Sequence, residues 1–198
     1  NVGDRIKVYV IDVKKATKGP QIFLSRSHPG LVRRLFELEV PEIADGTVEI
    51  KGVAREAGSR TKIAVYSHDE NVDPVGACVG NRGSRVQNIV DELFGEKIDI
   101  IVWDEDPAIL ISNVLRPAEV EGVYINYVSE KEKMATAVVP EQQLSLAIGR
   151  EGQNVRLAAR VSGWKIDIKS ESQAQELMAA EEAEHDVPAD ADLGAEEA

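Results

Sequence analysis

Several residue types and patterns that would indicate other protein classes are scarce in this chain of 198 residues. It has one cysteine, Cys78, which excludes an internal disulfide framework and fits a reducing cytoplasm. No apolar run approaches the roughly 20 residues that a membrane-spanning helix needs, so we expect no association with a membrane. Aromatic residues make up only 5% of the chain, and any packed core must therefore be aliphatic.

Motifs for catalysis, metal binding and cofactor binding are also missing. The three histidines are scattered among unrelated segments, which argues against a metal site or a histidine base. There is no Walker loop, nucleophile elbow, HExxH pair or zinc-ligand spacing. We therefore predict no catalytic residue, no metal and no cofactor, and a protein that is not an enzyme.

The net charge of −12 is concentrated at one end of the chain. Residues 171–198 contain ten acidic and no basic side chains, so residues 1–170 carry a net charge of only −2. Residues 144–169 contain five basic side chains against two acidic ones. Phosphate binding requires local positive potential, so the acidic total does not exclude a nucleic-acid partner. The tail, 171–198, has few groups that can bury surface, and we predict that it is mostly disordered, although part of it could be helical.

What the chain does contain is a repeat built around GxxG. The two copies, at 80–83 and 149–152, each follow an apolar stretch and open a helical pattern that ends at a glycine. Each helix leads into a strand that reads Lys-Ile-Asp-Ile, at 97–100 and 165–168. A single GxxG is a weak signal, because it also makes a plain turn between helices. Two copies in the same setting favour tandem KH modules, each of which clamps about four nucleotides of single-stranded nucleic acid.

The elements around the two loops predict two modules of the order α-β-β-α-α-β, an α/β (α+β) fold. The first module is predicted over 28–104 and the second over 105–170, and their short junction predicts that they pack as a pair. Asp-Pro pairs at 73–74 and 106–107 are typical of helix starts. Residues 1–27 read as two strands of a β-domain whose earlier strands are missing, so we expect the chain to be a piece of a longer protein.

The loops themselves have the chemistry of a phosphate clamp. Glycine allows the backbone to approach a phosphodiester closely, and the helix start beyond it presents N–H groups. The middle residues are expected to face solvent, where Arg82 and Arg150 can pair with phosphate. Glu151 is a counter-signal, because a carboxylate repels phosphate; it could instead cap the helix or be held away by Arg150.

The helix starts after the loops supply further candidate contacts. Two arginines, Arg85 and Arg156, fall on plausible contact faces, and Gln153 and Asn154 have amides that could read base edges or a ribose 2′-OH. The complete set of predicted RNA-binding residues is Gly80, Asn81, Arg82, Gly83, Arg85, Gly149, Arg150, Glu151, Gly152, Gln153, Asn154 and Arg156.

Beyond these loops, longer strings resemble the NusA family of bacterial transcription factors. The resemblance lies in residues 22–29, 36–50, 53–65, 95–101 and 143–160, the last of which reads QLSLAIGREGQNVRLAAR. It implies that residues 1–27 end an OB-fold RNA-binding domain and that two type II KH modules follow. It also implies a cytoplasmic, monomeric, non-enzymatic factor that binds single-stranded nascent RNA. A missing N-terminal region would dock on RNA polymerase, and other antitermination factors would be further partners. Such a factor modulates pausing, intrinsic termination and antitermination.

Two other functional classes stay open from the residues alone. A KH protein associated with the ribosome or with RNA folding would carry the same loops, and the missing N-terminal region would distinguish it. A fragment of a nuclease or GTPase with KH modules would need a catalytic domain wholly outside these residues.

Overall fold

The computed structural model describes residues 2–127 and 133–185. The first module contains α1 (Pro29–Glu39), α2 (Pro41–Ala44), β3 (Val48–Glu56), β4 (Arg60–Ser67), α3 (Pro74–Val79), α4 (Ser84–Glu92) and β5 (Lys97–Val102). The second contains α5 (Pro107–Val114), β6 (Gly122–Tyr127), β7 (Lys133–Val139), α6 (Leu144–Ile148), α7 (Gln153–Ser162) and β8 (Lys165–Ser170). Apart from the short α2, which the sequence analysis missed, both modules have the predicted order α-β-β-α-α-β.

The two modules have the same sheet topology. In the first, β4 lies between β3, to which it is antiparallel, and β5, to which it is parallel. In the second, β7 lies in the same way between β6 and β8. The Asp-Pro pairs begin helices as predicted: the Asp73 carboxylate accepts from two N–H groups of α3, and Asp106 accepts from Ala108 of α5. The tandem α+β fold predicted from the repeat is therefore confirmed.

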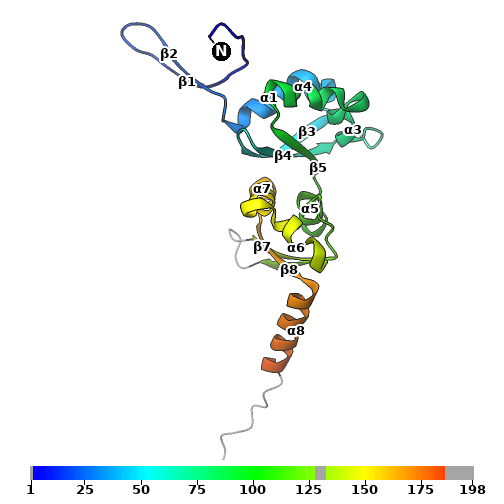
Figure 1. Ribbon diagram of the computed structural model, residues 1–198. Coiled ribbons are helices and arrows are strands. Elements are labelled where there is room, and N and C mark those ends of the chain that lie inside the picture. The colour runs from blue at the N-terminus through cyan, green and yellow to red at the C-terminus, as the bar shows by residue number, and fades with distance from the viewer. Residues whose placement is uncertain (1, 128–132, 186–198) are drawn as a thin grey trace, which may run out of the picture.

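The sheet of the first module is covered on both faces (Figure 1). One face packs against α1 and α4, with a core that includes Phe36, Ile63 and Ile89. The other face packs against α5 and α7 of the second module. A single cluster of buried side chains joins Ala54, Ala64 and Ile101 of the first module to ten residues of the second, among them Ile111, Leu157, Ala158 and Val161. The two modules therefore pack as a pair through a shared core.

Two close contacts show how tightly this interface is fitted. A Cβ placed on Gly52, in β3, would lie 2.7 Å from the carbonyl oxygen of Val161, in α7. Lys62, in β4, is fully buried, and its Nζ donates to the carbonyl of Arg116 at 2.8 Å and pairs with Asp99 at 3.2 Å. Glycine at position 52 thus allows the helix to lie directly on the strand.

The two ends of the described chain project from this pair (Figure 1). At the start, β1 (Tyr9–Lys14) and β2 (Gln21–Ser25) form an antiparallel hairpin. At the end, α8 (Glu171–His185) forms a helix, so the helical part of the tail is longer than the prediction of mostly disorder allows. The cause is local: the segment is rich in Ala, Glu and Gln, which favour helix even where little surface is buried. Residues 186–198 of the predicted disordered tail lie outside the described residues.

Candidate nucleic-acid interface

The two GxxG loops have nearly the same backbone conformation. The first glycines, Gly80 and Gly149, have φ of 73° and 79° with ψ of 177° and 169°. The third residues, Arg82 and Glu151, both have φ of 53°. This left-handed conformation costs a side-chain-bearing residue roughly 1–2 kcal/mol, and such strain is concentrated at functional sites. The loop geometry is therefore independent of the charge that it carries.

Behind each loop, one side chain packs against the first glycine. A Cβ on Gly80 would lie 2.6 Å from Cγ of Arg85, and one on Gly149 would lie 2.7 Å from the backbone N of Asn154. Arg85 donates through Nη1 to the carbonyl of Ala77 at 2.6 Å and to Glu42 at 2.9 Å. This arginine therefore links the loop to the preceding helix.

Asn154 plays the same part in the second module. It is only 5% exposed, and its Nδ2 donates to the carbonyls of Ala147 at 2.9 Å and Leu115 at 3.0 Å. Because Nδ2 is committed to these two carbonyls, only Oδ1 of the amide is left for the RNA contact predicted at Asn154, which stays a prediction. Arg85 Nη1 is bonded to protein acceptors, so this atom holds the loop in place, and the predicted phosphate contact of Arg85 stays a prediction.

Two more predicted contacts join the modules to each other. Gln153 Nε2 donates to Glu56 at 2.8 Å and to the Ser59 hydroxyl at 2.7 Å, both in the first module. Arg156 Nε donates to the same carboxylate at 2.6 Å. The hydrogen bonds from Arg156 and Gln153 hold the pKa of Glu56 below its ordinary value. These two side chains therefore fix the start of α7 against the β3–β4 turn, a role that the sequence analysis did not foresee.

The four middle residues of the loops lie at the surface, as predicted. Asn81 and Arg82 are exposed, and the side chains of Arg150 and Glu151 are 92% and 82% exposed. Arg150 Nε lies 3.8 Å from the Glu151 carboxylate, at the edge of ion-pair distance. Such an exposed pair contributes little to stability, so both side chains can rearrange around a ligand.

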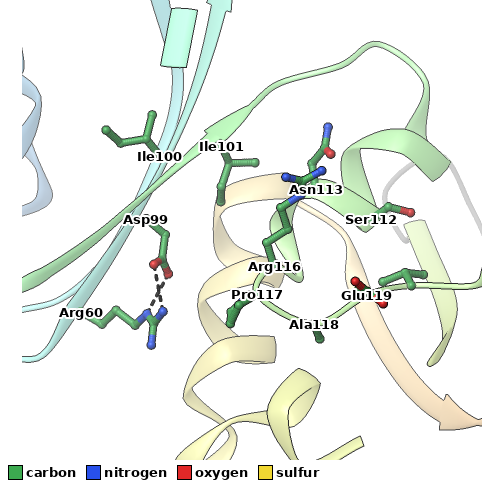
Figure 2. Close-up of a pocket in the computed structure, with 11 residues that line it drawn as sticks. Arg60, Asp99, Ile100, Ile101, Ser112, Asn113, Arg116, Pro117, Ala118 and Glu119 are labelled. Atoms are coloured by element: carbon green, nitrogen blue, oxygen red, sulfur yellow. Dashed lines mark hydrogen bonds and ion pairs between the residues drawn. The ribbon is translucent and has the colours of Figure 1, made fainter. Parts of the chain in front are cut away.

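A cleft of about 400 Å³, which we call the loop cleft, lies beside the second loop. Its wall includes Gly149, Arg150 and Asn154 of the second module, and Arg60 and Lys97 of the first. A larger cleft of about 710 Å³, the junction cleft, shares Arg60 with it and continues between the modules (Figure 2). The sequence analysis missed Arg60 and Lys97, because strand residues of one module give no local sign that they face the loop of the next.

Reactive groups are few among the described residues. Within residues 2–127 and 133–185, no three His, Cys, Asp or Glu side chains are grouped to hold a metal ion, and no helix there is long and apolar enough to cross a membrane. Cys78 is fully buried, and burial raises the pKa of its thiol to about 12. Cys78 is therefore a core residue, and its thiol is unsuited to act as a nucleophile.

Comparison with known families matches both modules. Residues 26–103 match the NusA-like first KH domain, and residues 107–176 match the NusA-like second KH domain. A solved crystal structure, that of the protein APE1850, superposes with a TM-score of 0.52 at 19% identity. The superposition covers 70% of this chain and 95% of the other, and it shows a shared fold.

Curated relatives are much closer in sequence. All three that we compare are named transcription termination/antitermination protein NusA. The protein from Halalkalibacterium halodurans is 64% identical over 174 residues, and that from Bacillus subtilis is 63% identical over 174 residues. The protein from Mycobacterium tuberculosis is 55% identical over 170 residues. These alignments cover 88%, 88% and 86% of this chain, but only 45%, 46% and 48% of the relatives, so the chain spans about half of their length.

Proposed function

Because this chain belongs to the NusA family, we propose that it is the single-stranded-RNA-binding part of a transcription elongation factor. It holds nascent RNA and thereby modulates pausing, termination and antitermination by RNA polymerase. The polymerase is contacted by a part of the protein outside this chain, and other antitermination factors join the assembly. The factor acts in the cytoplasm as a monomer and is not an enzyme.

The observation that carries this proposal is the repeated loop geometry. Each loop ends at the start of a helix, α4 or α7, where unpaired N–H groups and the helix dipole favour an anion. Each places two exposed residues at its tip, and each tip includes an arginine that can pair with a phosphate. Two such clamps fixed on one rigid support would hold two stretches of the same strand.

Apolar surface beside the second loop supports the same function. Leu146 and Ile148, on α6, are 46% and 37% exposed although they are large aliphatic side chains. Nucleotide bases have apolar faces that such side chains can cover. RNA bound with its backbone on the loop would therefore bury this surface under its bases.

We further propose that the β1–β2 hairpin is the end of an OB-fold domain. Most apolar side chains of this hairpin are exposed, which is costly for an isolated two-stranded ribbon. Further strands packed on them would remove that surface from water. The exposed residues are Val8, Val10, Ile11, Val13, Ile22, Phe23 and Leu24.

Charge reversal in the loops tests the RNA-binding function. The variants are Asn81→Asp with Arg82→Asp, Arg150→Asp with Glu151→Asp, and all four together. Aspartate tolerates the left-handed conformation better than most residues, and these positions are exposed, so the fold should persist. We expect each double variant to weaken binding of a fluorescein-labelled random single-stranded RNA by about tenfold, measured by anisotropy at low salt.

A control separates loop effects from general charge effects. Arg34→Asp makes the same change in net charge as Arg150→Asp with Glu151→Asp, at an exposed position on α1 that lines neither the loop cleft nor the junction cleft. It should change the affinity by less than about twofold. If the four-residue variant is folded by circular dichroism and binds RNA like the parent, the proposed function is wrong.

A further inference from the structure

The second loop differs from the first in what lies opposite it. The wall of the loop cleft that faces Arg150 is made by the first module, at the start of β4 and β5. It carries two cations, Arg60 and Lys97. At the first loop, Arg85 is instead paired with Glu42 of its own module at 2.9 Å. The second loop is thus faced by positive charge from the other module.

We propose that the first module completes the RNA site of the second, with Lys97 and Arg60 binding the backbone phosphate of a nucleotide whose neighbouring phosphate lies on Arg150. The loop cleft is then a composite nucleotide site. This inference rests on the RNA-binding function proposed above, and it assigns part of that function to strand residues outside both GxxG loops.

Arg60 is already held in position for such a contact. Its Nε and Nη2 donate to the two oxygens of Asp99 at 2.7 and 2.9 Å, which fixes the guanidinium plane (Figure 2). Within the described residues nothing bonds to its Nη1. The Asp99 carboxylate is shared with Lys62 at 3.2 Å. Arg60 therefore shares its carboxylate with a buried lysine and does not have the negative charge of Asp99 to itself.

The positive charge of the opposite wall offsets the acidic residue in the second loop. Glu151 cancels the charge of its neighbour Arg150 within the loop, which alone would make a poor phosphate clamp. Lys97 is exposed, and the backbone bond from its N–H to the Ser59 carbonyl at 3.1 Å fixes the start of its strand. With Lys97 and Arg60 included, three cationic side chains and no acidic one line the cleft, a composition that favours an anion.

The two walls are held together before any ligand binds. Gln153, directly after the second loop, donates to the Ser59 hydroxyl at 2.7 Å, directly before Arg60. The loop and the strand start are therefore adjacent in the free protein. A site that is already assembled avoids the ordering cost that weakens association.

An unsatisfied acceptor in the same wall also points to a ligand. Asn154 lines the loop cleft, and its Oδ1 is the buried side-chain atom without a hydrogen-bond partner among the described residues. Buried polar atoms are nearly always paired, so this one calls for an explanation. Its Nδ2 is anchored on two carbonyls, which fixes the direction of the amide. A ribose 2′-OH or a base amino group entering the cleft would supply the missing donor once a small shift of the cleft wall exposes this buried atom.

The repeat supplies a matched pair of variants for the test. Lys97 and Lys165 begin the same Lys-Ile-Asp-Ile strand in the two modules, but only Lys97 lines the loop cleft. The probe is a fluorescein-labelled random single-stranded RNA of about twelve nucleotides, long enough for two four-nucleotide clamps and the cleft between them. We expect Lys97→Ala to weaken binding about three- to tenfold and to lower the slope of log affinity against log salt by about 0.7, the value for one phosphate contact. Lys165→Ala should change the affinity by less than about twofold. Equal effects of the two variants would overturn the inference.

A double-mutant cycle then asks whether Lys97 and Arg150 act on the same nucleotide. We expect the loss in Lys97→Ala with Arg150→Ala to be smaller than the product of the single losses, because removing one wall loosens the nucleotide held by the other. Lys97→Ala with Arg82→Ala should give the simple product. Multiplicative losses in both cycles would overturn the composite site.

The outcomes also separate this inference from the proposed function. If Arg82→Ala and Arg150→Ala weaken binding while Lys97→Ala does not, RNA binding stands and the composite site is wrong. If the parent chain does not bind the RNA pool, both are wrong.

Discussion

Gly52 offers a direct test of the packing between the modules. This residue of β3 has no φ in the left-handed region, so alanine can adopt its backbone conformation. The obstacle is space alone: the added Cβ would lie 2.7 Å from the carbonyl oxygen of Val161 and 3.2 Å from its Cγ2. Because the nearer atom belongs to the backbone of α7, the methyl group can be accommodated only if the helix moves.

The size of the effect follows from the geometry. Overpacking by one methyl group against a backbone that cannot give way costs about 1–3 kcal/mol. The displaced helix contributes Leu157, Ala158 and Val161 to the shared core, so their packing is loosened as well. At about 2 kcal/mol, the expected fall in melting temperature is about 4–8 °C for a chain of this size.

The matched control is Gly122→Ala, at the equivalent first strand of the second module. The nearest atom to a Cβ there is Cε2 of Tyr124 at 3.9 Å, an ordinary contact. This variant should be neutral, or more stable by about 0.4–1 kcal/mol because alanine restricts the unfolded chain. Urea and thermal unfolding followed by circular dichroism measure both variants. If Gly52→Ala is as stable as Gly122→Ala, the direct contact between α7 and β3 is refuted.

Two further predictions concern buried groups of the first module. Burial opposes ionisation of Glu96, but hydrogen bonds from Arg55, Thr61 and the N–H of Gly58 outweigh it and hold its pKa below the ordinary value. The pair therefore stabilises the fold above the unfolded pKa of about 4.3, and this contribution is lost as pH falls through the lower folded pKa. Glu96→Gln should lower the free energy of unfolding by about 3–5 kcal/mol at pH 7, measured with urea, because it leaves a buried arginine unpaired. The difference in free energy between the variant and the parent should shrink in acid. A difference that stays constant with pH would contradict this account. Cys78, whose thiol pKa is raised to about 12 by burial, should react with a disulfide reagent at pH 8 only as fast as the protein opens, and rapid labelling of the folded chain would show that the thiol is accessible.

The fold could be predicted from the sequence because its signals are local. Periodicity, Asp-Pro caps and glycine stops lie within a few residues of the elements that they define. The short α2 has too few residues to show a period. Composition alone was also insufficient for α8, because its helix propensity predicts a helix whereas its low hydrophobicity predicts disorder.

The candidate site was predictable only in part, for a different physical reason. Glycine pattern and exposure are local, so the loops and their exposed tips could be located. The partners of the neighbouring side chains are not local: Gln153 and Arg156 bond to Glu56, which is about a hundred residues earlier in the chain. Only the packed structure shows that these side chains join the modules, and that Lys97 faces the second loop.

The shared left-handed conformation at the third loop position has a consequence for how such loops can diverge. Arg82 and Glu151 have opposite charges but the same φ of 53°, because the glycines and the side chain behind the loop determine the path of the backbone. Charge at the tip can therefore vary without altering the shape of the clamp, as long as β-branched residues, which the left-handed region excludes most strongly, are avoided. A single substitution at the tip can thus change the RNA affinity of one module, while both modules keep the same loop conformation.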